Sequence, residues 1–212
     1  MNNFKIRYKL LFIVLLFTAI TVHSQEINYV VEGNKLIDQG RTEEGIEYME
    51  KALKLNPQDA YAYYNIGRVY LQRNDLDTAI DFMKKALEIN DQIYEAYNNI
   101  GAAYYTKGDL DTAETYFQTA MLIDPSIADA YINLANVRHE VGDYEGAILI
   151  CESMLGYNLH HPAVYYTLGI NHYAAGNKLK AREALEEASA LYQKQGDERM
   201  IPIVKEVLSS IE

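Results

Sequence analysis

Apolar residues recur along this chain at helical spacing, with charged residues between them. Within residues 60–72 this spacing is seen at positions 4, 7, 8 and 11 of the segment, which are Tyr63, Ile66, Gly67 and Tyr70. That spacing places their side chains on one face of an α-helix. Only 12 Gly and 4 Pro punctuate the 212 residues, and both residue types disfavour helix interiors. The pattern predicts an all-α fold.

The apolar pattern itself repeats every 34 residues. Position 4 of each unit is Tyr, positions 8 and 20 are Gly or Ala, and position 27 is Ala except for Met154. Five units begin at Glu26, Ala60, Tyr94, Ala128 and Pro162, without insertion or deletion. A repeat of this length is typical of solenoid proteins, in which neighbouring units bury each other's apolar faces.

The stretch AYAYYNIGRVYLQRNDLDTAIDFMKKALEIN, residues 60–90, closely resembles the tetratricopeptide repeat (TPR) family. The resemblance implies an α-solenoid, a right-handed TPR superhelix of helix-turn-helix repeats. It extends over five repeats, at 26–59, 60–93, 94–127, 128–161 and 162–195. The departures are Glu32 in place of a large apolar residue, Met154 in place of a small one, and Pro162, which lies three residues late.

Residues that recur at the same position of each unit are the ones that a pair of antiparallel helices needs. Asp75 and Asp109 follow Asn or Gly in short turns, where Asp suits the N-cap of a second helix. Small residues at positions 8 and 20 let the two helices approach closely. Pro57 and Pro125 near the unit ends stop the second helix.

Residues 196–212 form a tail after the fifth unit. An apolar stripe in it predicts a capping helix from Ile201 to Ser210, with Pro202 in the first turn. Such a helix covers the last repeat, because the ends of a solenoid need capping. The alternative is an amphipathic helix that binds a partner. The stripe consists of Met200, Ile201, Val204, Val207, Leu208 and Ile211.

Residues 1–24 have the pattern of a signal peptide. Three basic residues precede the apolar run from Leu10 to Val22, which is shorter than the roughly 20 residues of a spanning helix. We expect cleavage after Ser24 and a periplasmic or extracellular mature chain without direct membrane insertion. The alternative is an uncleaved segment that tethers the chain to a membrane. Cleavage would remove three basic groups and change the formal charge from −11 to −14.

Composition narrows the classes of function. The acidic charge argues against nucleic acid as a partner, because phosphate binding needs a basic surface. The single cysteine, Cys151, cannot form an intrachain disulfide. Its position in the apolar pattern predicts that it lies on the buried face of a helix. The chain contains no catalytic motif, so we expect no enzyme activity and no cofactor. His139, His160, His161 and His172 are weak candidates for a metal site, and we expect none there.

The TPR resemblance further implies that one side of the first helices lines a concave, peptide-binding groove. The recurrent asparagines offer donors and acceptors for an extended backbone, although Asn is also common there in the family. The tyrosines add rigid contact area. The candidate groove residues are Tyr61, Tyr64, Asn65, Arg68, Asn98, Asn99, Tyr105, Asn133, Asn136, His139, Tyr166 and Tyr173.

Acidic groove residues bear on the partner. Glu95 and Asp129 stand where TPR proteins that capture a terminal carboxylate have cations, which favours a neutral or basic segment. We therefore expect a non-catalytic module that binds a protein or peptide as an adaptor or scaffold in the cell envelope. The alternative is a structural subunit that packs through its ends or convex face, or that self-associates.

Overall fold

The computed structural model describes residues 29–157 and 160–211, and every regular element among them is a helix. The all-α prediction is therefore confirmed. The predicted signal peptide, residues 1–24, lies outside the described residues. The chain forms two compact units, one ending at Gln92 and one beginning at Ile93, and each is described by itself. Among the described residues, no helix is both long and apolar enough to cross a membrane.

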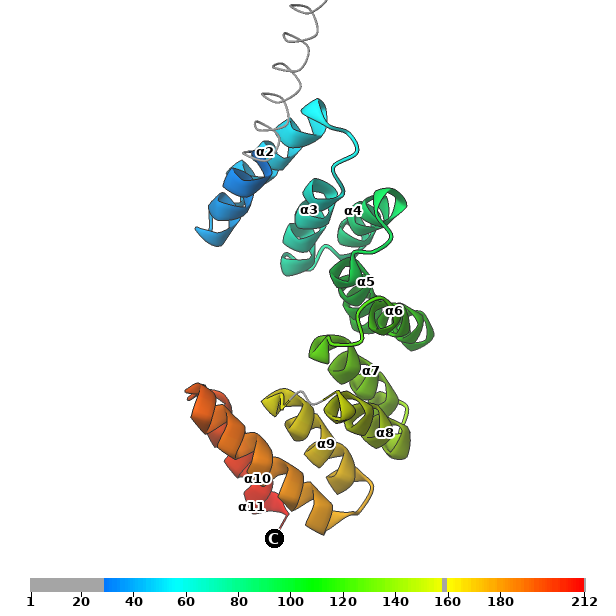
Figure 1. Cartoon of the computed structure of the whole chain (residues 1–212), viewed down its shortest axis with the longest axis vertical. Helices are drawn as coiled ribbons and strands as arrows, with labels where there is room; N and C mark the ends of the chain where they lie inside the picture. The colour runs from blue at the N-terminus through cyan, green and yellow to red at the C-terminus, as the bar shows by residue number, and fades with distance from the viewer. Residues whose placement is uncertain (1–28, 158–159, 212) are drawn as a thin grey trace, which may run out of the picture. The chain divides into compact units, whose positions relative to one another are not determined.

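The first unit contains a helix over residues 29–38 and three labelled helices (Figure 1). These are α2 (Thr42–Leu55), α3 (Ala60–Gln72) and α4 (Leu76–Ile89). Its core joins α2 to α3 through the buried side chains of Met49, Ala52, Ala62 and Ile66. Tyr70 of α3 also stacks on Phe82 of α4, with ring centroids 5.6 Å apart.

The second unit contains the remaining seven labelled helices of Figure 1. They are α5 (Tyr94–Thr106), α6 (Leu110–Ile123), α7 (Ala128–Glu140), α8 (Tyr144–Gly156), α9 (Pro162–Ala174), α10 (Lys178–Gln195) and α11 (Met200–Ser210). Helices α3, α5, α7 and α9 begin at the first residues of the second to fifth repeats. The helices in each of the pairs α5–α6, α7–α8 and α9–α10 pack on each other.

Short polar signals set the ends of these helices. The side chains of Asp75, Asp109 and Asp143 each accept a hydrogen bond from a backbone N–H in the first turn of α4, α6 or α8. This confirms the predicted N-caps at Asp75 and Asp109. Pro162, which departs from the family pattern, opens α9, where its fixed φ suits the first helical position and its missing N–H is not needed.

Glycines at position 8 lie where the two helices of a repeat meet. A methyl group added to Gly101 would come within 2.7 Å of the Phe117 ring, and one added to Gly67 would come equally close to Met83. Neither position has room for a side chain. The small residues predicted to allow close helix approach therefore do so in both units.

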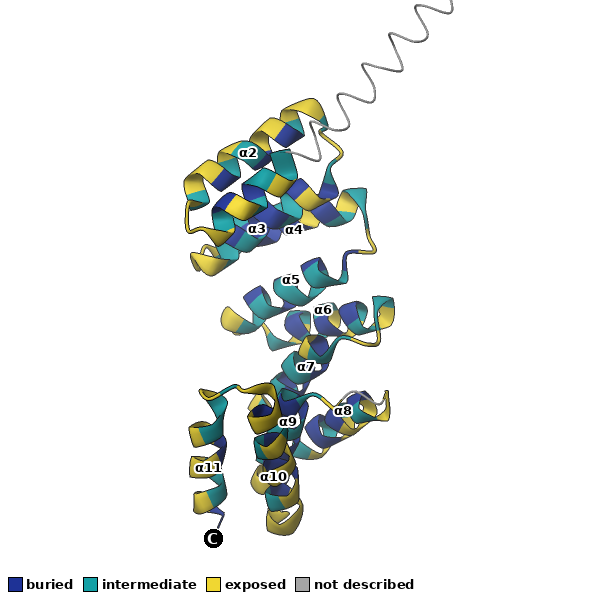
Figure 2. Cartoon of the chain, turned by 60° about the vertical axis from the view of Figure 1, so that its left-hand side comes forward, coloured by how far each residue is buried: buried dark blue, intermediate teal, exposed yellow. Residues whose placement is uncertain are grey.

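In the second unit, buried clusters join each second helix to the next first helix. Phe117 of α6 packs with Leu134 and Val137 of α7, and Cys151 of α8 packs with Val164 and Leu168 of α9. Burial raises the pKa of the Cys151 thiol to about 12, so the thiol stays protonated and serves as a core side chain, as predicted. Figure 2 shows buried and exposed residues alternating along the helices, as expected for amphipathic packing.

Helix α11 packs on α10 with its apolar stripe. Val204 and Ile211 are buried in one cluster with Leu185 and Tyr192 of α10. The predicted helix began one residue later, at Ile201, and ended at the same residue, Ser210. The tail therefore covers the apolar side of the last repeat, which is the capping arrangement.

Candidate functional site

The predicted groove residues all lie on first helices, namely α3, α5, α7 and α9. In the first unit they form a local cluster on α3. Arg68 donates a 3.1 Å hydrogen bond to the Asn65 side chain, and its guanidinium lies 5.9 Å from the Tyr64 ring centroid. Asn65 is only 5% exposed, so it supports Arg68 more than it presents an amide to solvent. Tyr61, by contrast, is 52% exposed.

In the second unit, polar side chains link the neighbouring first helices α5 and α7. The Asn133 side-chain amide donates to the Asn98 side-chain oxygen over 3.0 Å. The Tyr105 hydroxyl donates to the Glu140 carboxylate over 3.2 Å, and burial together with that carboxylate raises the Tyr105 pKa. Asn98 stands at position 5 of its repeat and Asn133 at position 6 of the next. The asparagines that recur at one position in the sequence, Asn65, Asn99 and Asn133, are all at position 6.

A second polar link joins α7 to α9. The Asn171 side-chain N–H group donates to the Thr167 carbonyl oxygen over 2.8 Å, which fixes the orientation of the Asn171 amide. Its oxygen therefore faces His139 Nδ1 at 2.9 Å, and His139 Nδ1 carries the proton of that bond. Asn171, which is buried, was not among the predicted site residues because its column holds mixed residue types.

The remaining candidates take up different surroundings. Asn99 and Asn136 are partly exposed on α5 and α7. Tyr166 packs against the cluster that α10 and α11 share, and the Tyr173 hydroxyl donates to the Ser210 carbonyl oxygen of α11 over 3.5 Å. These two tyrosines therefore lie beside the capping helix.

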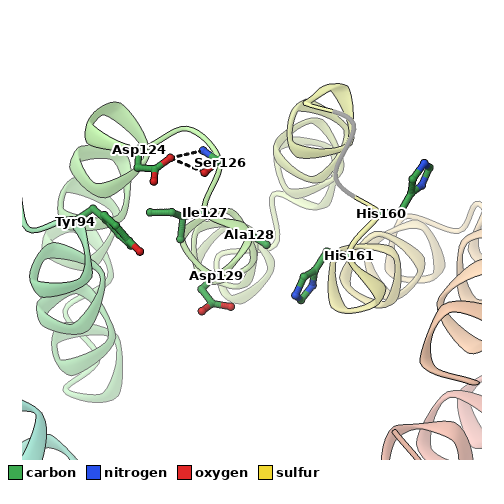
Figure 3. A pocket seen from close by; sticks show the side chains of 8 residues that line it. All are labelled: Tyr94, Asp124, Ser126, Ile127, Ala128, Asp129, His160 and His161. Atoms are coloured by element: carbon green, nitrogen blue, oxygen red, sulfur yellow. Dashed lines mark hydrogen bonds between the residues drawn. The ribbon is translucent and has the colours of Figure 1, made fainter. Parts of the chain in front are cut away.

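A pocket of about 410 Å³ opens at the N-terminal ends of the first helices of the second unit. Figure 3 shows Asp129 and His161 extending from neighbouring helix ends, whereas His160 points away from them. The Ser126 hydroxyl and backbone N–H both donate to Asp124, and they lower the pKa of this carboxyl group. The lining residues are Tyr94, Asp124, Ser126, Ile127, Ala128, Asp129, His160 and His161.

Sequence reasoning placed Asp129 in the groove but did not single out Tyr94, Asp124 or Ser126. They lie at junctions between repeats, where the columns are least regular. The histidines considered as metal ligands do not assemble, and among the described residues no group of three His, Cys, Asp or Glu side chains is arranged to hold a metal ion.

Comparison with known families identifies the chain. Residues 23–208 match the TPR family model described as the cilia and flagella-associated protein 70 C-terminal domain. The chain belongs to this TPR family. The match covers nearly all of the residues that form the two units, so the TPR resemblance seen in the repeat columns is confirmed. No curated protein sequence matches the chain.

Solved TPR structures show the same fold at low sequence identity. PilF of Pseudomonas aeruginosa has a TM-score of 0.72 at 18% identity, covering 90% of this chain and 93% of its own. YrrB, described as a TPR protein with an unusual peptide-binding site, has a TM-score of 0.63 at 22% identity over 90% and 97% of the two chains. The first TPR domain of Spaghetti (RPAP3), solved with an HSP90 peptide, has a TM-score of 0.53 at 20% identity over 56% and 94%. The predicted TPR α-solenoid is thereby confirmed.

Proposed function

We propose that this chain is a non-catalytic module that binds an extended protein or peptide segment along its first helices. The observation that carries the proposal is the amide pair Asn98–Asn133, which joins α5 to α7 over 3.0 Å. The bond uses one donor of Asn133 and one acceptor position of Asn98. The Asn133 oxygen and the Asn98 amide hydrogens therefore remain to pair with a ligand backbone.

The surroundings of this pair suit an extended ligand. His139 and Tyr105 are held in place by Asn171 and Glu140, so the surface is ordered before a ligand arrives. Ordering in advance reduces the entropy lost on binding. The peptide complex of the RPAP3 domain and the peptide-binding site of YrrB support this use of the fold.

A random peptide library displayed on phage tests the proposal. We expect selected peptides to bind the purified chain and to lose about fivefold or more in affinity with Asn133→Ala, because a buried backbone contact loses its partner. Asn177→Ala is the matched control, since Asn177 is exposed and its side chain does not cap α10. Fluorescence anisotropy gives the affinities, and circular dichroism checks folding. Failure to select any peptide, or equal effects of the two variants, would count against the proposal.

A second candidate function is a structural subunit that packs through its second helices or associates with itself. Large apolar side chains are exposed on α6, α8 and α10, with Leu122 82%, Leu149 63% and Leu179 71% exposed. Light scattering with wild type and Leu149→Ser decides this alternative. Assembly that Leu149→Ser abolishes would favour it, and a monomer at all concentrations would exclude self-association.

We further propose that the module works in the cell envelope as an adaptor or assembly scaffold, either exported or tethered by its N-terminal segment. The support is the basic and then apolar pattern of residues 1–24. Intact mass measurement of the native protein distinguishes the forms. A mature chain that begins at Gln25 indicates export with cleavage, and a full-length chain in the membrane fraction indicates a tether. A full-length chain in the cytosol would contradict both.

A further inference from the structure

We infer that the pocket at the ends of α5, α7 and α9 receives a lysine or arginine side chain of the bound segment. The inference rests on the proposed function and extends it, because it assigns the pocket a ligand chemistry. At about 410 Å³, the pocket falls within the range of small-ligand sites, about 300–1,000 Å³. It lies at the ends of the same helices that carry Asn98, Asn133 and His139, so one extended segment can reach both.

Charge favours a cation in this pocket. Asp124 and Asp129 line it, and neither Lys nor Arg does. Asp129 is exposed and forms no ion pair among the described residues. Asp124 keeps its negative charge near neutral pH because Ser126 stabilises the carboxylate. A ligand cation therefore meets carboxylates whose charge is not already neutralised by a protein cation.

The N-terminal ends of the helices repel a cation, so their partial positive charges must be compared with the negative charges of the carboxylates. Each helix N-terminus carries a partial charge of about +0.5, and three such ends lie near the pocket. Asp129 and Glu95 stand in the first turns of α7 and α5 and offset those two ends. The two carboxylates that line the pocket, Asp124 and Asp129, supply two full negative charges, which outweigh the three partial positive ones.

The other lining groups fit the rest of such a side chain. Ile127 and Ala128 offer apolar surface to its methylene groups, and the Tyr94 side chain also lines the pocket. His161 Nδ1 is buried and has no hydrogen-bond partner among the described residues.

Two synthetic peptides test the assignment, one with the sequence Ac-Gly-Ser-Asn-Arg-Asn-Ser-Gly-NH2 and one with citrulline in place of arginine. Citrulline keeps the shape of arginine and removes the charge. In a titration of the purified, isotope-labelled chain, we expect the arginine peptide to shift the backbone amides of Tyr94, Ala128, Asp129 and His161. We expect the citrulline peptide to bind with an affinity lower by about fivefold or more. Equal binding of both peptides would overturn the assignment.

Asp129→Asn and Asp111→Asn form the matched pair of variants. Both residues stand in the first turn of a helix, so both variants lose the same helix-dipole contribution, but Asp111 does not line the pocket. We expect Asp129→Asn to weaken the arginine peptide about fivefold and Asp111→Asn to leave it unchanged. Equal effects would overturn the assignment. Inorganic phosphate is the third probe, and shifts at the pocket amides with phosphate but not with the arginine peptide would make this an anion site instead.

The experiments can contradict the pocket assignment and the proposal for the first helices independently of each other. If Asn133→Ala weakens library-selected peptides while Asp129→Asn does not affect the arginine peptide, the groove proposal stands and the pocket assignment is wrong. If only Asp129→Asn has its expected effect, the pocket assignment stands without the groove.

Discussion

At the residue scale, the turns between paired helices show one backbone requirement met by two residue types. Gly108 and Gly142 have φ of 79° and 78°, and Asn74 occupies the corresponding position with φ of 60°. This left-handed region is costly for most side chains, although Asn enters it more readily than others. A Cβ at Gly108 would meet no atom within 4 Å, so any cost of substitution there comes from the backbone alone.

Gly108→Ala is therefore predicted to lower the free energy of unfolding by about 1–2 kcal/mol. Gly108→Asn should cost clearly less, because Asn74 already occupies the equivalent turn. Urea unfolding followed by circular dichroism measures both values. Equal losses for Ala and Asn would show that the turn does not discriminate between these side chains.

His172 leads to a prediction about acid stability. It is buried on α9, and its Nδ1 atom has no hydrogen-bond partner among the described residues. Burial lowers its pKa from 6.5; nearby Lys180 lowers it further, and Glu152 and Glu183 partly compensate. The unfolded chain consequently binds a proton at a higher pH than the folded chain does, and stability falls as the pH drops below about 6.5.

His172→Leu should flatten this dependence, since Leu36 occupies the equivalent position of the first repeat and is buried there. His160→Asn is the control, because His160 is exposed, and it should keep the wild-type slope. Urea unfolding at pH 7.5, 6.5 and 5.5 gives the change of unfolding free energy with pH for the wild type and the two variants. An unchanged slope in His172→Leu would assign the acid sensitivity to other groups.

At the element scale, the contact between paired helices depends on complementary sizes at positions 8 and 24. Gly101 faces Phe117, Gly67 faces Met83 and Gly169 faces Leu185. The fourth repeat has Ala135 and Cys151 at the equivalent positions, and both are fully buried in one cluster. The extra methyl group of Ala135 thus coincides with a smaller partner, which gives the single cysteine a packing explanation.

A double-mutant cycle tests this complementarity. Cys151→Leu alone should cost about 1–3 kcal/mol by overpacking against Ala135. Ala135→Gly alone should cost about 1 kcal/mol through helix propensity. Together they should cost less than the sum, by about 0.5 kcal/mol or more. Cys151→Leu combined with Ala190→Gly, at an exposed position of α10, is the control and should be additive. Additivity in the first pair as well would mean that the two side chains do not compete for space.

Features of these helices that depend on local sequence were predictable, and those that depend on contacts between different helices were not. The starts of α4 and α6 were predictable because Asp75 and Asp109 act locally as N-caps. Close helix contacts were predictable because only Gly or Ala fits them. The Asn98–Asn133 and His139–Asn171 pairs were not, because each depends on how side chains at different positions meet across two helices. The pocket likewise combines three junctions far apart in sequence.

At the scale of the whole molecule, the chain consists of two compact units that meet in sequence between Gln92 and Ile93. Nothing in the 34-residue period marks that point as a boundary, since it falls at an ordinary junction between repeats. The three clusters described for the second unit draw their buried side chains from that unit alone. Solenoid stability is approximately a sum over repeats and neighbouring interfaces, so a part with complete interfaces can be stable by itself.

We therefore predict that residues 93–212, expressed alone, form a helical protein that unfolds cooperatively in urea. The reason is that α11 covers one end of this unit, and its buried Val204 and Ile211 complete the last cluster. The same fragment ending at residue 196 lacks α11 and should unfold at lower urea, because it exposes apolar surface around Leu185 and Tyr192. Circular dichroism and urea titration compare the two fragments. If residues 93–212 prove unfolded while the whole chain is helical, the preceding repeats are needed for folding and the second unit is not autonomous.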